Sequence, residues 1–170
     1  MATAYPDWYA EEGAQMRNTK RNAIIAVGAI AVGLAVGPAA VSHVRGSLLR
    51  SGVEGSLPTD PMLAGAAAGG RPWVADRHSS VRVDRDGDVR IKVRGLVIPD
   101  APFNGTNPVP ALSASLVCGG VIVAETVTVP FDTAGNAKIR DEITVPERCL
   151  APAVLLHPGG NDAVYIGTSG

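Results

Sequence analysis

Two cysteines, Cys118 and Cys149, carry the best-defined chemistry in this chain of 170 residues, because no other cysteine is present. In a cytosolic protein, a reduced pair or a metal site would stay open, but in an exported protein an even count favours a disulfide. A structural zinc site needs about four ligands, and no histidine has zinc-ligand spacing to either cysteine. We therefore predict a Cys118–Cys149 disulfide, which would stabilise the fold by about 3–4 kcal/mol.

Asp84, Asp86 and Asp88 alternate around Gly87 and are the metal-ligand candidates of the sequence. The calcium-loop motif places glycine after the third acid and glutamate at the twelfth position. Here glycine precedes the third acid, and the twelfth position is Gly95. We expect a plain turn over a calcium site, and no cofactor is predicted.

Glu125 and Asp141 sit at the inward parity of two predicted strands. One interpretation is an acid pair that binds a metal or transfers protons, and the other is a β-bulge or an outward-turning strand edge. A buried carboxylate without a partner is costly, and the nearby Lys138 and Arg140 point the other way. We therefore expect no buried acid pair and at least one exposed side chain.

A serine hydrolase needs a serine, a base and an orienting acid that meet in space. Ser113 and Ser115 lie in a predicted strand, and only folding could bring His78 or His157 close to them. His157 precedes a proline in a predicted turn and is interpreted as structural. We predict no catalytic residue, so a non-catalytic binding or structural module is favoured, and a hydrolase or metal-dependent enzyme on the same scaffold is the alternative.

The central strands are predicted from period-two alternation of apolar residues. Residues 111–118 place Leu112, Ala114, Leu116 and Cys118 on one face, and Gly119-Gly120 predicts a hairpin into a strand at 121–131. A turn at 132–136 then leads to a third strand at 137–145.

Residues 80–85 and 89–98 predict an earlier hairpin, for which two registers keep the apolar faces matched. One ends the loop at Gly87, where a positive φ suits glycine, and sets Arg82 opposite Arg90. The other sets Asp84 opposite Arg90, which pairs opposite charges. We favour the register with the glycine.

With two short strands near 153–156 and 163–168, the pattern predicts an all-β domain over residues 73–170. Strands that recur at this spacing with turns between them are typical of an antiparallel β-sandwich. We expect an Ig-like sandwich of about seven strands.

Upstream of this domain, residues 1–15 are polar and residues 16–40 have the basic start, apolar middle and small-residue end of a signal peptide. Met16, fifteen residues after Met1, is therefore a candidate start of translation. We expect cleavage near Ala40 and a secreted or cell-surface protein. Residues 23–41 as a membrane anchor are the alternative, and a membrane is a partner only in that case. Residues 41–72 are predicted to be a flexible linker because they are rich in Gly, Pro, Ala and Ser.

The charge pattern bears on partners. A formal net charge of −1 gives no indication of nucleic acid. Arg82, Arg90, Lys92 and Arg94 form the outward face of the early hairpin, either as a solvated face or as a surface for a cell-wall polymer or surface protein.

Three motifs carry a loose resemblance: the Arg-Asp-Gly-Asp turn at 85–88, Leu-Ser-Ala-Ser-Leu-Val-Cys at 112–118, and Cys149 to Leu156. On these, residues 81–170 resemble small exported actinobacterial proteins of unknown function. The resemblance implies export and a β-sandwich, and it supplies no active-site residues.

Overall fold

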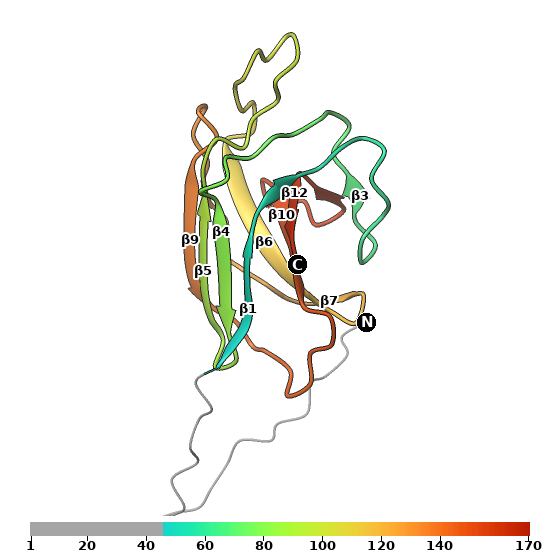
Figure 1. Cartoon of the computed structure of the whole chain (residues 1–170), viewed down its shortest axis with the longest axis vertical. Coiled ribbons are helices and arrows are strands. Elements are labelled where there is room, and N and C mark those ends of the chain that lie inside the picture. The colour runs from blue at the N-terminus through green and yellow to red at the C-terminus, as the bar shows by residue number, and fades with distance from the viewer. Residues whose placement is uncertain (1–45) are drawn as a thin grey trace, which may run out of the picture. The chain divides into compact units, whose positions relative to one another are not determined.

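A computed structural model describes residues 46–170, which form two antiparallel sheets packed face to face (Figure 1). The predictions for residues 1–45, including the signal peptide and the anchor, lie outside the described residues. Within 46–170, no helix has the length and apolar character needed to cross a membrane. The strands are β1 (Ser47–Gly52), β2 (Glu54–Gly55), β3 (Ala67–Ala68), β4 (Ser80–Asp84), β5 (Asp88–Val93), β6 (Ala111–Cys118), β7 (Val121–Glu125), β8 (Val129–Pro130), β9 (Ala137–Glu142), β10 (Ala153–Pro158), β11 (Val164–Tyr165) and β12 (Gly167–Ser169).

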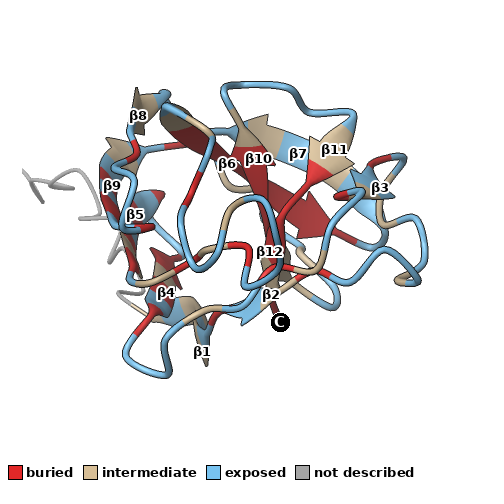
Figure 2. Cartoon of the chain, turned by 90° about the horizontal axis from the view of Figure 1, so that it is seen from above, coloured by how far each residue is buried: buried red, intermediate tan, exposed pale blue. Residues whose placement is uncertain are grey.

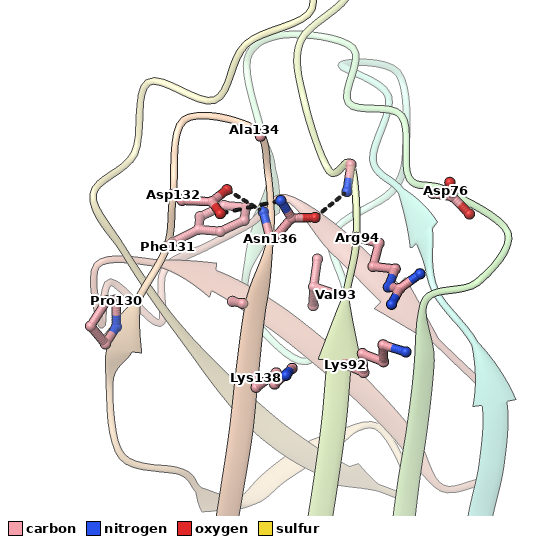
Figure 3. Close-up of a pocket in the computed structure, with 12 residues that line it drawn as sticks. Asp76, Lys92, Val93, Arg94, Pro130, Phe131, Asp132, Ala134, Asn136 and Lys138 are labelled. Atoms are coloured by element: carbon pink, nitrogen blue, oxygen red, sulfur yellow. Dashed lines mark hydrogen bonds between the residues drawn. The ribbon is translucent and has the colours of Figure 1, made fainter.

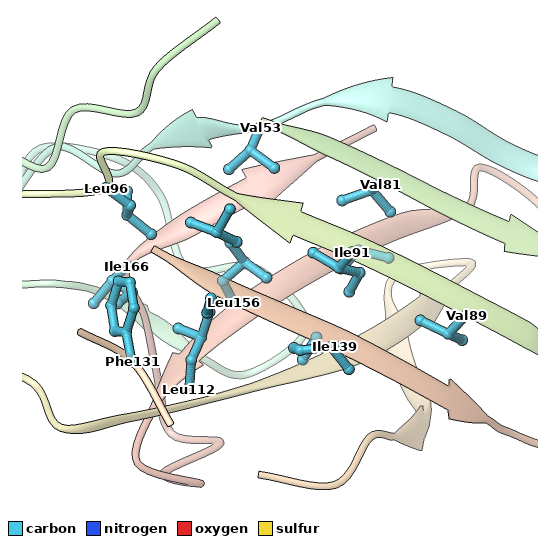
Figure 4. Packing of buried hydrophobic residues seen from close by; sticks show 14 of the residues in the cluster. Val53, Val81, Val89, Ile91, Leu96, Leu112, Phe131, Ile139, Leu156 and Ile166 are labelled. Carbon is cyan, nitrogen blue, oxygen red and sulfur yellow. The ribbon is translucent and has the colours of Figure 1, made fainter. Parts of the chain in front are cut away.

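The first sheet has the strand order β1-β4-β5-β9. The second has the order β2-β12-β10-β6-β7, and β8 also pairs with β6. A small parallel pair, β3 with β11, forms a separate two-stranded sheet. The inner faces bury one apolar cluster between them (Figure 4), to which β4, β5, β6, β9 and β10 all contribute. The prediction of an all-β domain with packed antiparallel sheets is confirmed.

The predicted flexible linker is wrong over residues 46–72, which belong to the folded domain. Strand β1 pairs with β4, and β2 pairs with the distant β12. A register shift between Ser47 and Leu49 interrupts the alternation of β1, so Leu48 and Leu49 both pack against the core. Because period-two alternation is the sequence signal of a strand, this bulge hid β1.

Residues 57–70 cover the outer face of the second sheet. Ala66 and Tyr165 are fully buried there with Val117 and Leu155, which gives a second, smaller apolar cluster. The Tyr165 hydroxyl donates a hydrogen bond of 2.7 Å to the Pro61 carbonyl. In Figure 2, β6 and β10 are accordingly coloured largely as buried, because both faces of these strands are covered.

The strand at 111–118 and its Gly119-Gly120 hairpin are confirmed, with Cys118 opposite Val121. The register then shifts between Leu116 and Val117, so that Ala124 lies opposite Leu116. The second and third predicted strands do not form a hairpin with each other, because β9 pairs with β5 in the other sheet. The 132–136 turn therefore carries the chain between sheets.

The favoured register of the early hairpin is confirmed. Arg82 lies opposite Arg90, Val83 lies opposite Val89, and Gly87 has φ of 100°. A Cβ on Gly87 would also collide with the Ile143 carbonyl oxygen. Both observations explain why glycine closes this loop.

Candidate functional site

The predicted disulfide between Cys118 and Cys149 is present. It joins the end of β6 to the segment between β9 and β10, and the Gly119 amide beside it donates a 2.7 Å hydrogen bond to the Leu150 carbonyl. Cys118 is buried and Cys149 is half-buried against the core. This bond fastens the segment that connects β9 to β10 to the end of β6.

The three aspartates of the early hairpin lie together, with ligand atoms within 4.8 Å of one another. Arginines already engage two of them. Arg82 Nε donates to both carboxylate oxygens of Asp84 at 2.9 Å, and Arg90 Nη2 donates to Asp88 at 3.3 Å. The arrangement is that of a salt-bridged turn, since each of these arginines competes with a cation for the carboxylate oxygens.

Glu125 and Asp141 do not form a buried pair, as predicted. Glu125 is exposed on β7 beyond the register shift. Asp141 is half-buried and accepts hydrogen bonds from the amides of Val127 at 2.7 Å and Glu142 at 2.9 Å. Asp141 thus fastens the segment after β7 to β9 across the edge of the sandwich.

Folding does bring a serine and a histidine together, in the interior. Ser115 Oγ lies 2.7 Å from His157 Nε2, and His157 Nδ1 lies 2.7 Å from the Val164 carbonyl oxygen. The carbonyl can only accept, so Nδ1 carries a proton, and in the neutral imidazole Nε2 then accepts from the serine hydroxyl. Both side chains are about 1% exposed. The prediction that His157 belongs to a turn is wrong, because β10 continues to Pro158.

A serine–histidine pair of this kind can activate a nucleophile only if a substrate reaches it. The surrounding strands are covered on both sides, and the principal surface hollows have other linings. The pair therefore satisfies buried polar groups between β6 and β10. His78, the other candidate base, is exposed and contacts Asp76 at 2.6 Å, away from both serines.

The outer face of the first sheet gathers basic side chains that the sequence scatters over ninety residues. Strand register places four arginines directly opposite one another, one from each strand: Arg50, Arg82, Arg90 and Arg140. We call these the arginine row. Lys92 lies opposite Lys138 two residues further along, and Arg94 follows on the same face. The basic face is defined as the arginine row with Lys92, Arg94 and Lys138.

Within the described part of the chain, most of this charge has no acidic partner. Among residues 46–170, only Arg82 and Arg90 of the basic face form ion pairs with carboxylates. The hydrogen bond to Asp84 raises the pKa of Arg82, so it stays protonated. Like charges directly opposite one another destabilise a sheet. A row of four arginines therefore opposes folding and favours the binding of a counter-charge.

The surface of this face is hollowed. A hollow of about 560 Å³ is lined by the arginine row together with Ser80, Lys92 and Lys138. It shares both lysines with an adjoining hollow of about 870 Å³ that extends to Asp132 and Asn136. Figure 3 shows Lys92 and Lys138 at one end of this second hollow and Asp132 at the other.

Acidic groups border the basic face at both ends of the strands. Asp84, Asp88 and Glu142 form the next row beyond the arginines. At the opposite end, hydrogen bonds from the Asn136 amide and side chain lower the pKa of Asp132. Hydrogen bonds from His78 likewise lower the pKa of Asp76. Both carboxyl groups therefore carry negative charge near neutral pH.

The sequence indicated only part of this site. Alternation placed Arg82, Arg90, Lys92 and Arg94 on one face, and it also placed Lys138 and Arg140 outward on their own strand. Nothing local to the sequence shows that β9 lies beside β5. Arg50 fell within the predicted linker and was missed.

No protein-family model matches this chain, and comparisons with curated proteins and with solved structures likewise found no match.

Proposed function

We propose that this chain is an exported, non-catalytic β-sandwich domain that binds an anionic component of the cell surface through the basic face. The observation that carries the proposal is the arginine row, in which one arginine from each strand of the first sheet faces outward at the same level. Solvated protein surfaces usually intersperse charges of both signs. A face of seven cations with two ion pairs departs from that pattern and has the charge complementarity of an anion-binding surface.

Two further features support this function. The disulfide suits an oxidising compartment, which agrees with export. Two antiparallel sheets, between which the chain crosses after β8, support assignment of the scaffold to the Ig-like sandwiches.

A hydrolase on the same scaffold remains the second candidate because Ser115 and His157 are hydrogen-bonded. The burial of both side chains argues against a hydrolase, since a nucleophile has to contact its substrate. The aspartate cluster gives a metal-dependent enzyme similarly little support, because arginines occupy two of the three carboxylates.

The test compares binding of the protein to dextran sulfate and to uncharged dextran, which share a backbone and differ in charge. We expect binding to dextran sulfate alone, weakening as salt is added because counterions screen the face. Arg90→Gln/Lys92→Gln should weaken this binding at least about fivefold, since a single lost charge-assisted contact is worth on the order of 1 kcal/mol. The control is Arg148→Gln, which removes an exposed charge outside the basic face. Equal binding by the double variant and the control would refute the proposal.

A further inference from the structure

The charges on the basic face are arranged with a direction. Along the strands, positive side chains occupy only three successive levels: the arginine row, then Lys92 with Lys138, then Arg94. Carboxylates follow at both ends, with Asp84, Asp88 and Glu142 at one and Asp76 and Asp132 at the other. A long anion that followed the strands would therefore run into negative charge at either end.

Across the strands, by contrast, the cations form a continuous row. The arginine row crosses all four strands of the sheet and reaches both edges, β1 and β9. With strands about 4.8 Å apart, the row spans about 14 Å between its outermost backbones. Gly52 and Ser80 stand beside it on β1 and β4 at the level of Lys92 and leave room next to the row. A chain laid across the sheet meets cations throughout and leaves at either side.

Among residues 46–170, the face also lacks the groups that recognise bases. Single-stranded nucleic acids are held by aromatic side chains on which bases stack. The side chains that line the arginine-row hollow are basic, aliphatic or serine, with no aromatic residue among them. Phe131 in the adjoining hollow is only 4% exposed. Such a surface recognises its ligand by charge. Guanidinium groups bind phosphate, sulfate and carboxylate alike.

From this geometry we infer that the ligand is a linear polyanion, such as an anionic cell-wall polymer, which lies across the strands along the arginine row. The inference rests on the proposed function and adds the form of the ligand and its direction on the sheet. Each arginine takes one anionic group, and the two edge arginines, Arg50 and Arg140, hold the chain where it enters and leaves.

The salt dependence of the binding affinity gives the number of ionic contacts between the protein and the polyanion. Each neutralised charge of a flexible polyanion contributes about −0.7 to the slope of log affinity against log salt. Four contacts predict a loss of roughly 50-fold in affinity between about 50 and about 200 mM salt, and two contacts predict roughly 7-fold. This slope responds to the number of charges engaged, which a purely structural change would not alter.

The experiment measures this slope for the full chain with inorganic polyphosphate of defined lengths. Two double variants remove the same charge: Arg50→Gln/Arg140→Gln at the ends of the row, and Lys92→Gln/Arg94→Gln along β5. We expect the first to lower the slope to that of two contacts and the second to change affinity by less than about threefold at fixed salt, through screened long-range attraction alone. Affinity should also rise with polyphosphate length until the chain spans the row.

Three results would overturn the inference while leaving the proposed function intact. They are equal affinity for the shortest and longest chains, a slope lowered by the β5 variant and not by the row variant, and preference for single-stranded DNA over polyphosphate of equal charge. Absence of binding to every length would instead reject the proposed function itself. Sulfated and carboxylated oligosaccharides, tested in parallel, distinguish which anionic group the row prefers.

Discussion

Replacement of Ser115 by alanine tests whether the buried serine–histidine pair is structural or catalytic. The substitution leaves Nε2 of the buried His157 without its hydrogen-bond donor. A buried acceptor without a partner costs about 1–3 kcal/mol, so we expect the free energy of unfolding to fall by that amount. Urea denaturation followed by the fluorescence of the buried Trp73 measures it.

Ser113→Ala is the matched control. Ser113 lies on the same strand and face, is also buried, and stands opposite His157 in the register, but its side chain makes no hydrogen bond to another described residue. Removal of a hydroxyl that has no such partner should leave the free energy of unfolding nearly unchanged.

A double-mutant cycle with His157→Leu isolates the interaction. Once the histidine is removed, Ser115→Ala no longer strands an acceptor, so the double variant should be about as stable as His157→Leu alone. The expected coupling is on the order of 1 kcal/mol. Equal effects of Ser113→Ala and Ser115→Ala would refute the structural role. Loss of hydrolysis of a reactive ester in Ser115→Ala alone would establish a catalytic one.

Three further predictions concern stability. Reduction of the Cys118–Cys149 bond, which closes a separation of 31 residues, should lower the free energy of unfolding by about 3.7 kcal/mol in the chain-entropy model, measured by urea denaturation with and without reductant. Gly87→Ala should destabilise by several kcal/mol, of the order of 3, because its positive φ and the Ile143 carbonyl both exclude a Cβ; near-wild-type thermal stability would contradict this. Asp132 has a lowered folded pKa, so its stabilisation is present above its unfolded pKa of about 3.9 and is lost as pH falls through the lower folded value. Asp132→Asn should therefore flatten the dependence of the free energy of unfolding on pH below about pH 4. An unchanged dependence in this range would show that this carboxylate does not contribute to stability.

What the sequence predicted correctly was local. The alternation of residues 111–118 identified β6 with its bounds, and Gly87 selected the register of the early hairpin. The count of cysteines, with the expectation of export, identified the disulfide. Each of these depends on residues within one strand or one turn, or on residues of a single kind.

What the sequence did not predict depends on contacts between distant segments. The turn at 132–136 has the same residues whether β9 pairs with its predecessor or crosses to β5, so the sheet it joins is undetermined locally. The arginine row exists only once that crossing and the pairing of β1 are known. The Ser115–His157 bond likewise follows from the pairing of β6 with β10.

The pairing of β2 with β12 also bears on the order in which the chain can fold. Gly55 lies opposite Gly167, and the Ser56 amide donates to the Ile166 carbonyl, so these partners are more than a hundred residues apart. Contacts of such long sequence separation form slowly, because closing a large loop is entropically unfavourable. During synthesis, Glu54, Gly55 and residues 67–69 must therefore wait until residues 163–168 have left the ribosome before they can pair with them. The pairing of β2 with β12 and of β3 with β11 is thus a late event in the folding of this domain.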